Sequence, residues 1–163
     1  MWHRFSESAR RAISAAQEEA QRLGHGLVST EHLLMGILRV ADPAVVSLLG
    51  EFRIPVEKLN AELNREVFAG DAPMTIQDMT LTPHAKRVID WTLKEAKQLG
   101  DKEMTNEHFV LGILSEQESF AAQLLLRLGM DADRARRKVF ALHGGKAEEY
   151  RNRVPAEPPP TEA

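Results

Sequence analysis

An internal repeat constrains the fold of this chain more than any other feature of its sequence. Residues 30–38 are TEHLLMGIL and residues 106–114 are NEHFVLGIL, so one motif occurs twice at an offset of 76 positions. Residues 5–68 align with residues 81–144 without a gap and with about fourteen identities. An ungapped match of this length indicates a tandem duplication. The two halves of the chain should therefore share one fold.

The start of each copy predicts two helices. The N-cap candidates Ser6 and Thr82 precede apolar residues spaced three and four apart, and a Leu-Gly pair follows where such a helix would end. The motif itself forms the second helix, which Thr30 and Asn106 are expected to cap. Gly36 lowers helix propensity there, as its counterpart in the second copy does. These glycines indicate a close crossing of two helices.

The rest of each copy predicts two further helices, at 43–52 and 55–68 in the first and at 119–128 and 131–142 in the second. No segment alternates between apolar and polar residues with a period of two, so no β-sheet is predicted. The expected fold class is all-α, with eight helices in two sets of four. A four-helix unit buries a limited core by itself, so we expect one globular domain with pseudo-two-fold symmetry rather than two independent units.

The predicted organisation has four parts along the chain. The first repeat covers residues 5–69 and the second covers residues 81–144, joined by a linker at 70–80. Residues 145–163 contain four prolines and little apolar material, so we expect a flexible Pro- and acid-rich tail or the beginning of a longer linker.

Composition excludes several classes of site and partner. The chain has no cysteine, which excludes disulfides and thiolate metal sites. It has no apolar run long enough to span a membrane and no signal-like start, so membrane association is not expected and the cytoplasm is the default location. Net charge is −3. We interpret the one basic cluster as a solvated helix face and expect no nucleic-acid partner; it comprises Arg134, Arg136, Arg137 and Lys138.

Two segments carry a resemblance to a known family. They are FSESARRAISAAQEEAQRLGHGLVSTEHLLMGILR and LTPHAKRVIDWTLKEAKQLGDKEMTNEHFVLGIL, and over residues 5–143 the chain resembles the N-terminal domain of Clp-type AAA+ unfoldases, closest to the ClpC branch. The resemblance implies a duplicated four-helix domain that is not an enzyme and needs no cofactor. Such a domain binds protein substrates and adaptor proteins and delivers them to an ATP-driven Clp ring, and in ClpC relatives it binds phosphoarginine. The isolated domain should be a monomer.

A nucleotide-hydrolysing module is not expected within this chain. The nearest approach to a P-loop is Gly144-Gly145-Lys146-Ala147, which lacks the first glycine, the hydroxyl residue and a preceding strand. Two alternatives follow. The chain is the N domain of a ClpC-like unfoldase, or it is a free-standing relative that binds the same ligands as a decoy or adaptor.

Glu31 and Glu107 are the candidate ligand-binding residues. A carboxylate can accept two parallel hydrogen bonds from the guanidinium of phosphoarginine, although a glutamate in the first turn of a helix also has a purely electrostatic role there. Helix N-termini would supply donors to the phosphate, and the candidates are Ser6, Glu7, Ser8 and Thr82. Because relatives usually have Thr where this chain has Asn106, the first copy is the better-supported site.

The histidines that follow these glutamates raise a second possibility, a small helical hydrolase or metal enzyme using Glu31, His32, Glu107 and His108. Neighbouring residues on a helix do not share a face, however, and the H-E-x-x-H pattern of zinc proteases is absent. The other histidines, including His143, add no ligand at a useful spacing. We therefore expect structural hydrogen bonds, no catalytic residue and no metal site.

Overall fold

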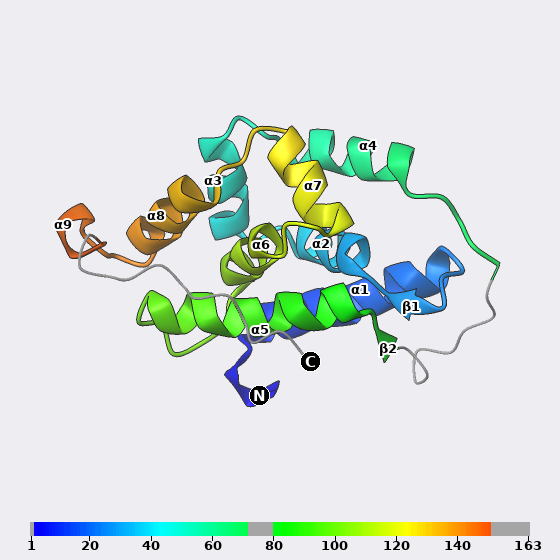
Figure 1. Ribbon diagram of the computed structural model, residues 1–163, viewed down its shortest axis with the longest axis horizontal. Helices are drawn as coiled ribbons and strands as arrows, with labels where there is room; N and C mark the ends of the chain where they lie inside the picture. Colours follow the sequence, from blue (N-terminus) through cyan, green and yellow to red (C-terminus); the bar gives the residue numbers. More distant parts are fainter. Residues whose placement is uncertain (1, 72–79, 151–163) are drawn as a thin grey trace.

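The repeat in the sequence is a repeat of helices (Figure 1). The structure of the protein is a computed structural model, in which residues 2–71 and 80–150 are described. The first copy forms α1 (Glu7–Arg22), α2 (Thr30–Val40), α3 (Pro43–Glu51) and α4 (Val56–Glu66). The second copy forms α5 (Pro83–Gln98), α6 (Asn106–Ser115), α7 (Phe120–Arg127) and α8 (Ala132–Leu142). The predicted all-α fold of eight repeat helices is confirmed.

Two short elements flank these eight helices. A 3₁₀ turn, η1 (Trp2–Arg4), precedes α1, and α9 (Ala147–Tyr150) follows α8. The ring of Tyr150 contacts that of Phe140 at a centroid distance of 5.7 Å, so α9 packs on α8. Most of the predicted linker, at 72–79, and most of the predicted tail, at 151–163, lie outside the described residues. The proposed domain boundaries stay a prediction.

The predicted caps of the first helix in each copy are confirmed. The side-chain oxygens of Ser6 and Thr82 each accept a hydrogen bond from the backbone N–H three residues later, both at 3.1 Å. Both helices end where Gly24 and Gly100 take positive φ angles of 69° and 79°. Glycine has no Cβ to oppose that conformation.

The predicted caps of the second helix in each copy are wrong by one residue. Ser29 and Thr105 occupy the N-cap positions with extended backbone, and Thr30 and Asn106 are the first helical residues. A histidine at the third helical position completes each capping box by accepting a hydrogen bond from the backbone N–H of the cap residue. Glutamate or glutamine usually has this role, which is why the sequence did not indicate it.

The expectation that no sheet would form is also wrong, because the structure contains a two-stranded sheet. β1 (Leu27–Val28) pairs in parallel with β2 (Thr80–Leu81), and each strand has only two residues. Two residues contain a single alternation, so the sequence carries no periodic signal for them. An isolated bridge between Phe5 and Met104 repeats this pairing in the other half of the molecule.

These pairings join the two repeats crosswise. The backbone N–H of Thr82 donates to the carbonyl oxygen of Val28 at 2.9 Å, and that of Ser6 donates to the carbonyl oxygen of Met104 at 2.9 Å. The segment that begins each repeat is thus held against the loop before the second helix of the other repeat. Positions 76 residues apart make equivalent bonds, which supports the predicted pseudo-two-fold symmetry.

One hydrophobic core contains side chains from both repeats, so the chain is a single domain. Buried residues include Leu34 and Leu48 from the first repeat and Phe109 and Leu124 from the second. In the middle of Figure 1, α2 and α6 contact each other, and each also contacts the third helix of the other repeat. Within the described residues no single helix is long and apolar enough to cross a membrane; only α2 and α3 taken together would be, and they are bent by 113°.

Candidate functional site

Glu31 lies in an open pocket between the two repeats. The pocket has a volume of about 490 Å³ and is lined by the loop before α2, by Ser29, Glu31 and His32, and by Thr82 at the start of α5. The crosswise backbone bond from Thr82 to Val28 brings the N-terminus of α5 to this place. We call this pocket the Glu31 site, defined by Glu31 and Thr82.

The carboxylate of Glu31 has no cationic side chain paired with it among the residues that the structure describes. Burial raises the pKa of Glu31, while a hydrogen bond from its own backbone N–H and the nearby His25 act in the opposite direction. A half-buried carboxylate that faces an open pocket loses part of its hydration, and without an ion-pair partner this loss is poorly compensated. It is therefore suited to accept a cationic ligand.

The equivalent place in the second repeat is arranged differently. The backbone N–H of Ser6, just before α1, donates to Met104 in the loop before α6. Glu107 lies in the first turn of α6. We call this the Glu107 site, defined by Glu107 and Ser6. Here the glutamate is only 5% exposed, and His143 Nε2 lies 2.8 Å from its Oε2.

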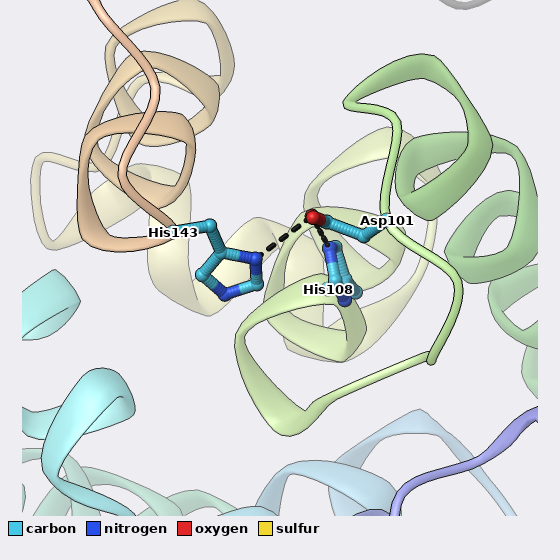
Figure 2. Close-up of side chains that lie close together, drawn as sticks. All are labelled: Asp101, His108 and His143. Atoms are coloured by element: carbon cyan, nitrogen blue, oxygen red, sulfur yellow. Dashed lines mark hydrogen bonds and ion pairs between the residues drawn. The ribbon is translucent and has the colours of Figure 1, made fainter.

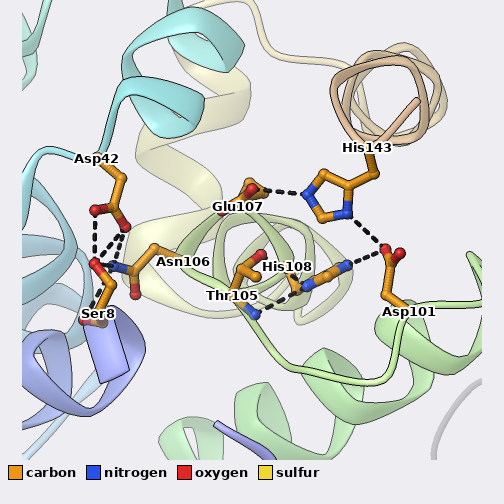
Figure 3. A network of polar contacts seen from close by, with 8 residues as sticks. All are labelled: Ser8, Asp42, Asp101, Thr105, Asn106, Glu107, His108 and His143. Atoms are coloured by element: carbon orange, nitrogen blue, oxygen red, sulfur yellow. Dashed lines mark hydrogen bonds and ion pairs between the residues drawn. The ribbon is translucent and has the colours of Figure 1, made fainter. Parts of the chain in front are cut away.

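The ring of His143 lies between the carboxylates of Asp101 and Glu107 (Figure 3). Its Nδ1 is 2.8 Å from Asp101 Oδ2 and its Nε2 is 2.8 Å from Glu107 Oε2, so both ring nitrogens donate. The hydrogen bond to Glu107 raises the pKa of His143, burial opposes this, and the bond to Asp101 adds to it. Burial raises the pKa of Glu107, but hydrogen bonds from His143, its own backbone and Thr105 outweigh burial and hold it below its ordinary value. The ring is thus an imidazolium between two anions.

Asp101, His108 and His143 converge, although the sequence had suggested no such cluster (Figure 2). One ligand atom from each lies within 4.8 Å of the others, which is close enough to consider a metal ion. The backbone N–H of Thr105, however, donates to His108 Nδ1 at 3.0 Å. A neutral imidazole that accepts at Nδ1 carries its proton on Nε2, so the nitrogen that faces the cluster has no lone pair for a metal. The geometry favours the 2.8 Å hydrogen bond to Asp101 instead.

The pair of histidines in the first repeat forms a chain of hydrogen bonds. Ser29 N–H donates to His32 Nδ1 at 2.9 Å, which leaves the proton on Nε2 to be donated to His25 Nδ1 at 2.7 Å. His25 Nε2 then donates to the carbonyl oxygen of Phe68 at 2.7 Å. The ring of His32 faces His25 while Glu31 lines the pocket, and this arrangement does not form a catalytic pair.

Acid should destabilise the protein through His32. Burial, and then the charge of His25, lower its pKa from 6.5 to about 4. As pH falls below 6.5 the unfolded chain binds a proton that the folded protein does not bind until about pH 4. Stability is therefore lost across that window, by about 3 kcal/mol at most. Urea unfolding between pH 7 and pH 4 measures the loss, and NMR titration of the His32 ring assigns it. A ring midpoint near 6.5 would contradict the prediction.

The remaining candidate residues have different positions. Ser8 Oγ donates to Asp42 at 2.6 Å, and Asn106 Nδ2 donates to the same carboxylate at 2.7 Å, so both residues tie α1 and α6 to the start of α3 (Figure 3). Thr30 is buried and its Oγ1 accepts a hydrogen bond from Ala121 N–H at 3.2 Å. These three side chains serve the contact between repeats, whereas Glu7 is exposed at the first position of α1.

Known proteins resemble this chain in sequence and in fold. The family model described as "Clp repeat (R) N-terminal domain" matches residues 4–128 and 81–162. The chain is 37% identical over 144 residues to the negative regulator of genetic competence ClpC/MecB of Bacillus subtilis, and 35% identical over 144 residues to the chaperone protein ClpB of Oceanobacillus iheyensis. Each match covers 88% of this chain but only 18% of the relative.

A solved structure has the same fold. It is the N-terminal domain of the chaperone ClpD from Arabidopsis thaliana, with a TM-score of 0.65 and 25% sequence identity. The match covers 88% of this chain and 99% of that domain. The similarity therefore extends over the whole of the solved domain.

Proposed function

The chain belongs to the Clp repeat N-terminal domain family, whose domains are non-catalytic, and we propose that it binds protein substrates and adaptor proteins through the Glu31 site. The ligand group that we propose is phosphoarginine. The observation that carries the proposal is the half-buried Glu31 carboxylate, which has no cationic partner among the described residues and shares an open pocket with the N-terminus of α5.

The carboxylate fits the cationic part of this ligand. A guanidinium group is planar and can donate two parallel hydrogen bonds to one carboxylate, which an ammonium group cannot do. Binding would also give Glu31 the positive partner that no described residue supplies. This chemistry favours an arginine derivative over a lysine derivative.

The N-terminus of α5 fits the anionic part. The helix dipole favours negative charge at this end. In the first turn Pro83 has no N–H, and the N–H of Ala85 donates to Thr82. His84 would therefore supply the backbone donor to the phosphate. Thr82 holds this end of α5 beside Glu31 and adds a hydroxyl group. A ligand with a phosphate directly on its guanidinium places both charges close together, and Glu31 and Thr82 line one pocket. Unmodified arginine should bind poorly because it lacks the anion.

Delivery of the bound protein to a Clp ATPase ring is the proposed use of this binding. The chain spans about 18% of the length of the curated relatives that it matches. The same pocket would also serve a free-standing decoy or adaptor. Size measurement of the protein as it occurs in the cell distinguishes these two forms.

Replacing Glu31 by alanine tests the binding role. We expect a loss of at least tenfold in affinity for free phosphoarginine, on the order of 1.5–3 kcal/mol for a charged hydrogen-bonded pair. Glu31→Gln should also weaken binding, because the amide has no charge and one acceptor oxygen. Glu107→Ala should have a smaller effect than Glu31→Ala. Titration calorimetry measures all four proteins, the parent included.

Glu57→Ala is the matched control. Glu57 also lies in the first turn of a helix, α4, but is exposed and does not line the Glu31 pocket. Glu57→Ala should cost a few tenths of a kcal/mol in stability through the helix dipole, whereas burial of Glu31 opposes that contribution. Only Glu31→Ala should reduce binding. Equal binding by the parent and by the Glu31→Ala, Glu107→Ala double variant would refute the proposed function.

A further inference from the structure

We propose that the protein closes its own second site. The ring of His143 occupies the position on Glu107 that a ligand guanidinium would take, so the chain has one open phosphoarginine site, at Glu31, rather than two. This inference rests on the proposed function of the Glu31 site.

The contacts of His143 leave little of Glu107 for a ligand. His143 Nε2 bonds Glu107 Oε2 at 2.8 Å, and Thr105 and the backbone also donate to this carboxylate. Only 5% of Glu107 is exposed. A guanidinium would have to displace a charged donor that is already in place. At Glu31 it would meet a carboxylate that has no cationic partner among residues 2–71 and 80–150.

His143 is itself held on two sides. Asp101 accepts from its Nδ1 at 2.8 Å, and the ring of His108 contacts its ring edge-on at a centroid distance of 5.1 Å. Asp101 also accepts from His108, whose other nitrogen is fixed by the capping box of α6. Releasing His143 from Glu107 would therefore leave a buried carboxylate without its cation.

The repeat explains why the two sites differ. His143 is the C-cap residue of α8, and the C-cap residue of α4, 76 positions earlier, is Val67. The counterpart of Asp101 is His25, which accepts from His32 and donates to the backbone. The first repeat thus has neither the donor at the helix end nor the anion that would hold it. Two substitutions between the copies convert an open site into a closed one.

Exchanging these residues tests the inference. We expect calorimetry to give one phosphoarginine bound per parent chain, with NMR shifts at the Thr82 amide and not at Ser6. His143→Val should give two bound, with shifts at both amides. The reciprocal variant His25→Asp, Val67→His should place an imidazole on Glu31 and so close the Glu31 site. Binding at Thr82 should then weaken at least tenfold. Circular dichroism checks the folding of each variant.

The outcomes separate this inference from the function on which it rests. Two equivalent sites in the parent would overturn the closure and leave the proposed function intact. A single site in a folded His143→Val protein, or undiminished binding by the reciprocal variant, would also overturn the closure alone. If His143→Val does not fold, the reciprocal variant decides. Absence of binding by the parent and both variants would refute the proposed function and, with it, this inference.

Discussion

Replacing Gly36 by alanine is expected to destabilise the protein by roughly 3 kcal/mol or more, at the upper end of the effect of overpacking. A Cβ atom at this position would lie 2.1 Å from the carbonyl oxygen of Ala12 and 2.8 Å from the backbone nitrogen of Ala16. Both are backbone atoms of α1, so no side chain can move aside. The helices α1 and α2 would have to separate along their contact.

Gly50→Ala is the control for this prediction. Gly50 lies within α3, and nothing is within 4 Å of the position that its Cβ would take. Alanine there should stabilise the protein by up to about 1 kcal/mol through helix propensity. Urea unfolding measures both variants. A Gly36→Ala protein within 0.5 kcal/mol of the parent would show that the helices are not in close contact.

Removing the side chain of Arg136 should cost about 3–5 kcal/mol, because it would leave a buried carboxylate without its cation. Arg136 Nε donates to both carboxylate oxygens of Glu95 at 3.0 Å, and Glu95 is fully buried. Ser115 Oγ donates to the same carboxylate at 3.0 Å but brings no charge. We expect Arg136→Ala to unfold at a much lower urea concentration than the parent.

The neighbouring residue gives a matched control. Arg137 pairs with Asp133, and both side chains are more than half exposed. Arg137→Ala should change stability by no more than about 1 kcal/mol. The double variant Glu95→Met, Arg136→Met removes both charges together and should recover most of the stability lost in Arg136→Ala. A double variant as unstable as Arg136→Ala would contradict this account.

The repeat predicted the helices because each depends on residues near one another in the chain. The caps Ser6 and Thr82 and the glycine-marked crossing at Gly36 are confirmed, since caps and helix spacing are local properties. The interpretation of Arg136 as part of a solvated helix face is wrong. Its partner Glu95 lies 41 positions away, so charge pattern along α8 could not indicate it.

The sequence identified Glu31 as a candidate but could not show what surrounds it. Ser6 and Thr82 were equivalent candidates for the anion, and only the crosswise strand pairing associates Thr82 with Glu31. The cluster at His143 was missed for a similar reason, because Asp101 and His143 are 42 positions apart. One signal was available: aligning the copies places Val67 opposite His143, a difference in chemistry at equivalent helix ends.

Because of the crosswise pairing, each site is formed by residues from both repeats. One wall of the Glu31 site comes from the first repeat and the other, at Thr82, comes from the second. Any ligand that touches both walls stabilises the domain against their separation, by an amount that grows with the ligand concentration relative to its Kd. Such a ligand would stabilise the contact between the repeats. A single repeat produced alone would retain only one wall of the site and should not bind the ligand. Binding at the Glu31 site is therefore coupled to the contact between the two repeats.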